Sequence, residues 1–262
     1  MKRIRFFIIL MIILSITLSS CSLRETSLSG ADNLSKKKLC WGLKRNPKSA
    51  PDINPGEEEI LKAYNGVYLG DTKSKSLYLT FDEGYENGYT SKILDILKKH
   101  NVPACFFVTG PYLKSETELI CRMTDEGHDV GNHTVNHHSM PSLSEEETEY
   151  ELIELDRLFF ETTGKSMKFL RPPMGEHSEK SMYLSDKLGY KTVFWSIAYE
   201  DWNVNKQPSI DYVFSSVMDN LHSGAVILMH AVSSANAAAL EKIIVEAKNQ
   251  GYTFKSLTTL DT

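Results

Sequence analysis

Apolar and polar positions alternate with two different periods along most of this chain. Short runs rich in β-branched and aromatic residues, which favour buried strands, lie at residues 76–81, 104–108, 129–132, 169–171, 192–197, 225–229 and 252–255. Apolar residues at helical spacing fill the intervals, at residues 90–100, 113–126, 144–163, 178–188, 210–221 and 235–249. These repeated strand–helix units predict an α/β fold with seven parallel strands, enough to curl the sheet into a barrel, and with the helices outside it.

Two of the predicted helices carry recognisable end signals. The segment 144–163 should begin at Ser144 as the N-cap, with Glu147 completing a capping box, and Gly164 should end it. An additional helix is expected after the Asn-Pro-Gly sequence at residues 54–56, because three glutamates follow and favour the positive end of a helix dipole.

The N-terminus is predicted to be an export signal, at residues 1–20. A basic start precedes the apolar run 6–18, which is too short to span a membrane comfortably, and small residues follow it. The sequence LSSC ending at Cys21 resembles a bacterial lipoprotein box, so we favour lipid attachment at Cys21 over a secreted form or an uncleaved anchor. Each of these places the rest of the chain outside the cytoplasm, at the outer face of a bacterial membrane or in the wall space.

Residues 21–50 are predicted to form a tether, because they are rich in Ser, Lys and Asn and show no sustained periodicity. Trp41 is the exception, since a lone aromatic residue in a polar tether usually docks on the domain that it precedes. One domain is therefore expected at residues 51–262, with order beginning near Trp41.

Composition excludes one class of partner. The formal net charge is -5 and no basic block of useful length occurs, which argues against nucleic acid binding. After Cys21 three cysteines remain, Cys40, Cys105 and Cys121, without a C-x-x-C spacing that would indicate a cysteine metal site. Their odd number leaves at least one thiol without an intramolecular partner.

Ionisable residues gather after the predicted strands. In parallel α/β folds the reactive groups lie at the carboxyl ends of the strands, so groups from different strands meet there. The residues in question are Asp82 and Glu83 after the first strand, His133 and His137 after the third, Arg171 at the end of the fourth, Asp201 after the fifth and His230 at the end of the sixth. On one helical turn two histidines four residues apart share a face, and with a carboxylate they could hold one metal ion with a position left open for water.

Taken one at a time, these residues also have ordinary structural explanations. Adjacent acids are most often solvated, Arg171 before two prolines could be a surface residue, and His230 could be a satisfied core histidine. Their joint order along the chain favours a common site over those explanations.

The motifs TFDEG, HTVNH, RPPMG, AYEDW and LMH, in this order, resemble those of the polysaccharide deacetylases, the NodB-homology group of carbohydrate esterases. The resemblance extends from about Trp41 to the C-terminus and implies a distorted (β/α)7 barrel. The stretches TFDEGYENGYT, VFWSIAYEDW, WGLKRN and QGYTFKSL are most similar to the spore cortex muramic acid deacetylases. Those enzymes remove acetate from N-acetylmuramic acid in peptide-free peptidoglycan strands, and the freed amine can close to a muramic δ-lactam.

The resemblance also implies a role for each site residue. His133, His137 and Glu83 match the metal ligands, for which Zn²⁺ is the expected ion and Co²⁺ or Mn²⁺ are compatible. Asp82 matches the general base, and Arg171 matches the cation that orients it.

Leaving-group and substrate contacts follow from the same resemblance. His230 matches the general acid and Asp201 the partner that holds its protonated ring. The backbone N–H of Met174 matches the oxyanion donor, and Trp202 and Leu228 match the walls of the pocket for the acetyl methyl group.

Glu83 departs from the family pattern. The family has aspartate at this position and the muramic acid subgroup often has asparagine, whereas glutamate keeps the charge and adds a methylene. The side chain could therefore ligate from a shifted position, or point away and leave a two-histidine site.

Three hypotheses follow for the function. The favoured one is an exported, metal-dependent deacetylase of muramic acid residues. The second is a deacetylase of N-acetylglucosamine in peptidoglycan or chitin-like oligomers. The third is a catalytically impaired lipoprotein that only binds wall glycan, which the intact remaining motif positions argue against.

Overall fold

A computed structural model describes residues 31, 33–46 and 49–260 of the chain. The predicted export signal, the lipoprotein box at Cys21 and residues 22–30 of the predicted tether lie outside the described residues. Within the described part, no helix is both long enough and apolar enough to cross a membrane.

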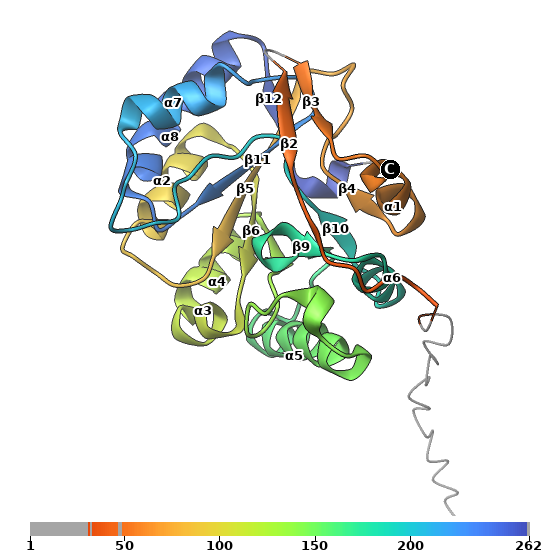
Figure 1. The fold of residues 1–262 in the computed structure, drawn as a ribbon. Coiled ribbons are helices and arrows are strands. Elements are labelled where there is room, and N and C mark those ends of the chain that lie inside the picture. Colours follow the sequence, from red (N-terminus) through yellow and green to blue (C-terminus); the bar gives the residue numbers. More distant parts are fainter. Residues whose placement is uncertain (1–30, 32, 47–48, 261–262) are drawn as a thin grey trace, which may run out of the picture.

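A curled parallel sheet forms the centre of the molecule (Figure 1). Its strands run in the order β11-β5-β6-β7-β8-β10-β4, and β12 pairs with β5 outside this path. Their bounds are β4 Gly66–Val67, β5 Ser76–Glu83, β6 Ala104–Val108, β7 Asp129–Asn132, β8 Phe169–Leu170, β10 Lys191–Val193, β11 Ala225–His230 and β12 Thr253–Phe254. Isolated bridges pair Leu69 and Ile197, near the far edge of the sheet, with residues of β11, so the sheet curves towards closure. The predicted α/β fold with a curled parallel sheet is thereby confirmed, and the sheet forms a half-barrel.

Helices surround the sheet in Figure 1, as the alternating pattern predicts. Their bounds are α1 Glu57–Ala63, α2 Thr90–His100, α3 Gly110–Ser115, α4 Thr117–Asp125, α5 Glu145–Thr163, α6 Glu179–Lys187, α7 Ile210–Met218 and α8 Ser234–Asn249. Short 3-10 turns lie at Met140–Ser142, Pro173–Gly175 and Leu257–Thr259. The Ser144 capping box and the left-handed Gly164 at the ends of α5 are both present.

One predicted helix is wrong. The segment 113–126 forms two helices, because Glu116 leaves helical geometry and serves as the C-cap of α3 and the N-cap of α4. The first of these also starts earlier than predicted, where the Thr109 hydroxyl accepts a hydrogen bond from the N–H of Tyr112 and a proline occupies the first turn.

Side chains along β5 alternate between two cores. Leu77, Leu79 and Phe81 pack between the sheet and its helices. Tyr78 packs with Phe107 and other residues inside the curl of the sheet. Because this alternation has a period of two, residue 82 continues the inner face and residue 83 the outer face.

Before the barrel, an N-terminal extension packs against it. Strand β1 (Leu39–Cys40) pairs antiparallel with β9 (Glu176–His177), and β2 (Leu43–Asn46) pairs with β3 (Ser49–Ile53). Trp41 is buried in this region, as expected for an aromatic residue that docks. Residues 39–40, 43–46 and 49–50, which lie on the tether side of the predicted boundary at residue 50, therefore contribute strands to the folded unit.

Candidate active site

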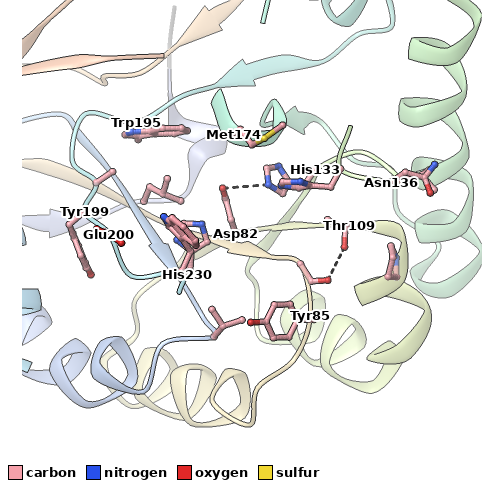
Figure 2. Close-up of a pocket in the computed structure, with 18 residues that line it drawn as sticks. Asp82, Tyr85, Thr109, His133, Asn136, Met174, Trp195, Tyr199, Glu200 and His230 are labelled. Atoms are coloured by element: carbon pink, nitrogen blue, oxygen red, sulfur yellow. Dashed lines mark hydrogen bonds and ion pairs between the residues drawn. The ribbon is translucent and has the colours of Figure 1, made fainter. Parts of the chain in front are cut away.

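A cavity of about 900 Å³ opens at the carboxyl ends of the strands. Its lining includes the predicted site residues Asp82, His133, His137, Met174, Trp202, Leu228 and His230. Figure 2 shows Asp82 between His133 on one side and His230 on the other. The prediction that different strands contribute to one site therefore holds for most of these residues.

Asp82 and His230 are direct neighbours in the sheet. Asp82 lies near the end of β5 and His230 ends β11, and the two are register partners in the parallel pairing of these strands. Neighbouring strands lie about 4.8 Å apart, so a small substrate group in the cavity can reach both side chains.

A buried arginine controls the charge of Asp82. Arg171 Nη1 donates to Asp82 Oδ1 at 2.7 Å, and His133 Nε2 lies 3.6 Å from Oδ2. Burial opposes ionisation of this carboxyl group, but Arg171, His133 and His230 outweigh it and lower the pKa of Asp82. The carboxylate is therefore ionised at neutral pH.

Arg171 does not line the cavity but lies behind Asp82, fully buried. Its Nε donates to the Val193 carbonyl at 3.1 Å and its Nη2 to the Phe194 carbonyl at 3.4 Å. The guanidinium also lies 4.2 Å from the centre of the Phe107 ring. These contacts satisfy the buried cation and fix the direction of its bond to Asp82.

His230 is held by a buried carboxylate. Its Nδ1 lies 2.7 Å from Asp201 Oδ1, and its backbone N–H donates to Asp201 Oδ2 at 2.9 Å. Burial disfavours the charged ring, but Asp201 and then Asp82 outweigh this effect and raise the pKa of His230. Since Asp201 occupies Nδ1, the other ring nitrogen is the one available to a substrate.

Asn236 completes this arrangement, and the sequence did not single it out. Its Nδ2 donates to Asp201 Oδ2 at 2.6 Å and to the His230 carbonyl at 2.9 Å, while its Oδ1 accepts from the Tyr199 hydroxyl at 2.9 Å. Asn236 is fully buried in the first turn of α8, and the alanines on both sides of it, at positions 235 and 237–239, were the available sequence signal.

The two histidines after β7 meet through a loop rather than a helical turn, which corrects the predicted geometry. Their ring centroids lie 4.8 Å apart. Thr134 and His137 have positive φ angles of 66° and 57°, and the His137 N–H donates to the Thr134 hydroxyl at 3.0 Å. This compact turn folds His137 back towards His133.

A helix residue anchors the same loop. The buried carboxylate of Glu151 on α5 accepts hydrogen bonds from Asn136 N–H at 2.7 Å and from Asn136 Nδ2 at 2.6 Å. The Glu151 carbonyl accepts from the N–H of Val135 at 3.2 Å. Because two left-handed residues flank these contacts, Glu151 stabilises a backbone that the sequence alone would rarely adopt.

Both histidines suit a role as neutral ligands. Burial lowers the pKa of His133 to about 4 and also lowers the pKa of His137. His133 Nδ1 lies 2.7 Å from the Arg171 carbonyl, so Nδ1 donates and the lone pair of Nε2 faces the cavity.

The Glu83 side chain does not line the cavity beside His133 and His137. Strand β5 continues through residue 83, so the side chains of Asp82 and Glu83 point to opposite faces of the sheet. Glu83 Oε1 accepts a hydrogen bond from the Thr90 hydroxyl at 3.5 Å, while Oε2 is buried without a hydrogen-bond partner. Burial first, and then Glu86 and Asp82, raise its pKa well above the usual range. The predicted placement of both acids in a loop after the strand is therefore wrong.

The predicted three-residue metal set is accordingly incomplete in this conformation. Within residues 31, 33–46 and 49–260, no group of three or more His, Cys, Asp and Glu side chains is arranged to hold a metal ion. His133 and His137 fit two positions of such a site, and Glu83 does not supply the third.

The three predicted substrate contacts all line the cavity. Leu228 is buried in its wall, as a contact for a methyl group requires, whereas Trp202 is 56% exposed and lies at the rim. Met174 is 57% exposed and has a left-handed backbone with φ 59°. Further lining residues that the sequence did not single out include Tyr85, Asn136, Trp195, Tyr199 and Glu200.

The cysteines take no part in the site. Cys40, Cys105 and Cys121 are free thiols, and Cys105 is buried among apolar residues inside the curl of the sheet.

Known proteins are similar to this chain in sequence and in fold. The polysaccharide deacetylase family pattern matches residues 69–193. Peptidoglycan-N-acetylmuramic acid deacetylase PdaA of Bacillus subtilis is 43% identical over 232 residues, which are 88% of this chain and 88% of the relative. The solved structure of Bacillus subtilis PdaA, a family 4 carbohydrate esterase, is similar with a TM-score of 0.84 and covers 87% of this chain and 98% of the other. A peptidoglycan-N-acetylglucosamine deacetylase of Bacillus cereus is 32% identical over 204 residues, covering 76% of this chain and 73% of the relative.

Proposed function

Because this chain belongs to the polysaccharide deacetylases of carbohydrate esterase family 4, we propose that it hydrolyses the N-acetyl group of N-acetylmuramic acid in peptidoglycan glycan strands. The observation that carries this proposal is the pairing of Asp82 with His230 across adjacent strands at one cavity. Amide hydrolysis needs a proton acceptor for water and a proton donor for the leaving amine, and these two side chains supply them.

Asp82 acts as the general base in this proposal. Its Oδ1 is bonded to Arg171 Nη1, so Oδ2 takes the proton from the attacking water. The lowered pKa keeps the carboxylate ready for this step at neutral pH.

His230 acts as the general acid. Asp201 holds Nδ1, and the raised pKa favours the protonated ring, so Nε2 carries the proton that passes to the leaving amine. Once the amine is protonated, the carbon–nitrogen bond can break and acetate leaves.

The remaining contacts select and stabilise the acetyl group. The Met174 backbone N–H is proposed to donate to the developing oxyanion. Leu228 packs against the methyl group from the buried side of the cavity, while Trp202 closes the cavity at its rim.

Deacetylases of this family are generally metal-dependent. We propose a divalent metal at His133 and His137, with Zn²⁺ as the expected ion and Co²⁺ or Mn²⁺ as alternatives. When bound, such an ion polarises the acetamide carbonyl and lowers the pKa of water. Two neutral imidazoles that face the cavity support this proposal.

The second candidate, a deacetylase of N-acetylglucosamine, is supported by the likeness to the Bacillus cereus protein. It ranks lower because the identity to the muramic acid deacetylase is 43% against 32%. The binding-only candidate is disfavoured because both pairs of the proposed catalytic machinery are in contact. Arg171 donates a hydrogen bond to Asp82, and Asp201 is hydrogen-bonded to His230.

Acetate release from peptide-free glycan, with mass spectrometry of the products, tests the proposed substrate. The expected result is loss of acetyl groups from muramic acid residues, with closure of the freed amine to the δ-lactam as the proposed later fate. Release from N-acetylglucosamine alone would replace the first candidate with the second, and no release from either sugar with Zn²⁺, Co²⁺ or Mn²⁺ supplied would favour the binding-only candidate.

The site of action is proposed from the N-terminal sequence. The basic and apolar leader and the LSSC sequence at Cys21 support export and lipid anchoring, which would bring the cavity to the cell wall or the spore cortex space. Metabolic labelling with a fatty acid tests this, and a Cys21→Ala variant that still incorporates label would contradict it.

A further inference from the structure

The turn that carries Met174 has a demanding backbone conformation. Met174 and Gly175 both have left-handed φ angles, 59° and 67°, directly after Pro172 and Pro173. A left-handed methionine is strained, and such residues persist only where the surroundings hold them in place. Because Met174 lines the cavity, whatever holds this turn also sets one wall of the active site.

Trp41 of the N-terminal extension packs directly on this turn. Its backbone N–H donates to the Gly175 carbonyl at 3.0 Å, and its Nε1 donates to the carbonyl of Trp195, another lining residue, at 2.9 Å. The indole is buried and stacks on Phe194 with ring centroids 4.4 Å apart. A Cβ atom at Gly175 would lie 2.9 Å from the Trp41 Cβ, so the contact leaves no space for a side chain.

A buried pair fixes the other end of the same turn. His177 Nε2 lies 2.7 Å from Glu57 Oε2, and His177 Nδ1 lies 3.1 Å from the Gly175 carbonyl. Both side chains are buried, and Glu57 begins helix α1 of the extension. A buried hydrogen-bonded pair of this kind is costly to break, so it opposes movement of the turn relative to α1.

The Gly175 carbonyl is the point where these contacts meet. It accepts the hydrogen bond from Trp41 N–H and lies next to His177 Nδ1, while the pairing of β9 with β1 begins at the following residue, Glu176. Trp41 and Glu57 both precede residue 69, where the match to the polysaccharide deacetylase family pattern begins. These two contacts to the turn therefore come from outside the matched segment.

We propose that Trp41, Glu57 and His177 are positioning residues that hold the 172–177 turn and so place the Met174 N–H for the developing oxyanion. The chemical role of the Met174 N–H in this inference rests on the proposed function. The restraint of the turn rests only on the contacts described above. None of the three residues touches the reacting atoms.

Glu57→Ala tests the inference most cleanly, because it removes one partner of the pair and leaves Trp41 in place. The matched control is Glu58→Ala on the same helix, since Glu58 is exposed and pairs with Lys62. Glu57→Gln keeps a hydrogen-bonding group and serves as the conservative rescue, and Trp41→Phe keeps the stacking on Phe194 while losing the bond from Nε1.

We expect Glu57→Ala to lower kcat for acetate release by about tenfold or more with KM nearly unchanged, since the loss of one oxyanion donor typically costs about 10² to 10³ in kcat. Hydrogen exchange of the backbone over residues 172–177 should be faster in Glu57→Ala and in Trp41→Phe than in Glu58→Ala. Glu57→Gln should recover most of kcat. All variants are compared below their melting temperatures.

Unchanged exchange over 172–177 in Glu57→Ala would overturn the restraint, and a lowered melting temperature with unchanged kcat would overturn the positioning role. If the wild-type protein itself released no acetate, the proposed function would fail, while the exchange measurement would still decide whether the extension holds the turn.

Discussion

Asp82 and His230 are partners in adjacent strands but have opposite requirements for charge. Asp82 must be ionised to take a proton, and Arg171 lowers its pKa. His230 must be protonated to give one, and Asp201 raises its pKa against the effect of burial. Activity should therefore be bell-shaped in pH, with an acid limb set by Asp82 and an alkaline limb set by His230.

Asp201→Asn should move the alkaline limb to lower pH. The substitution removes the negative charge that favours the protonated ring, so the pKa of His230 falls and the acid form is lost earlier as pH rises. The acid limb should keep its position, and kcat at neutral pH should fall by about tenfold or more. A pH profile of kcat/KM checks this, and an alkaline limb that stayed in place would remove His230 from the role of general acid.

The metal ligands can be separated by metal analysis. His137→Ala should reduce bound Zn²⁺ to about one tenth or less, because it removes one of two imidazoles that face the cavity. Glu83→Ala should leave the metal content close to that of the wild type, because Glu83 faces Thr90 on the other side of the sheet. Equal loss of metal in both variants would show that Glu83 turns into the cavity and ligates as the sequence predicts.

Sequence patterns predicted that several residues share one cavity but not the direction of every side chain. Asp82, His133 and His230 were found because each lies at or just beyond the carboxyl end of a strand and together they match an ordered set of motifs. Glu83 was misplaced because the apolar run ends at Phe81, whereas β5 continues two residues further and turns the second acid outwards. Pairing with β6 causes this extension, and a single strand's composition does not contain that information.

At the scale of elements, loops and their anchors determine the site. The loop with His133 and His137 depends on two left-handed residues, which an i,i+4 spacing cannot reveal. Helix α2 begins and ends at the predicted residues. The segment predicted as one helix at 113–126 is instead divided between α3 and α4, because a cap at Thr109 starts α3 at a position where the spacing of apolar residues does not indicate a helix.

Glu151 provides a test at this scale. Glu151→Ala leaves both Asn136 donors without their partner, so the loop should loosen and Zn²⁺ affinity should fall by about 10-fold to 100-fold, as for the loss of other groups that orient ligands. Titration of metal-free protein with Zn²⁺ measures this effect. Glu154→Ala on the same helix is the control, since Glu154 pairs with Arg157, and equal affinities in the two variants would contradict the anchoring role.

At the scale of the whole molecule, the alternation of strands and helices is enough to predict the curled parallel sheet and the end at which the site lies. The sequence predicted that order begins near Trp41, but not that residues 39–40 and 43–46 form strands, because these strands are short and β1 pairs with β9, which is far away in the sequence. Tyr85, an exposed aromatic residue of the cavity, was also missed, since loops have no periodic pattern.

The central claim is that one cavity holds a base and an acid that together split an acetamide. The most direct test of this claim is to measure acetate release from peptide-free glycan by the Asp82→Asn variant and by the wild type. Circular dichroism confirms that the two proteins are folded to the same extent. Because asparagine fits the space but cannot take the proton of water, the rate should fall by about 10² to 10⁴. A variant that released acetate within a few-fold of the wild-type rate would contradict the claim.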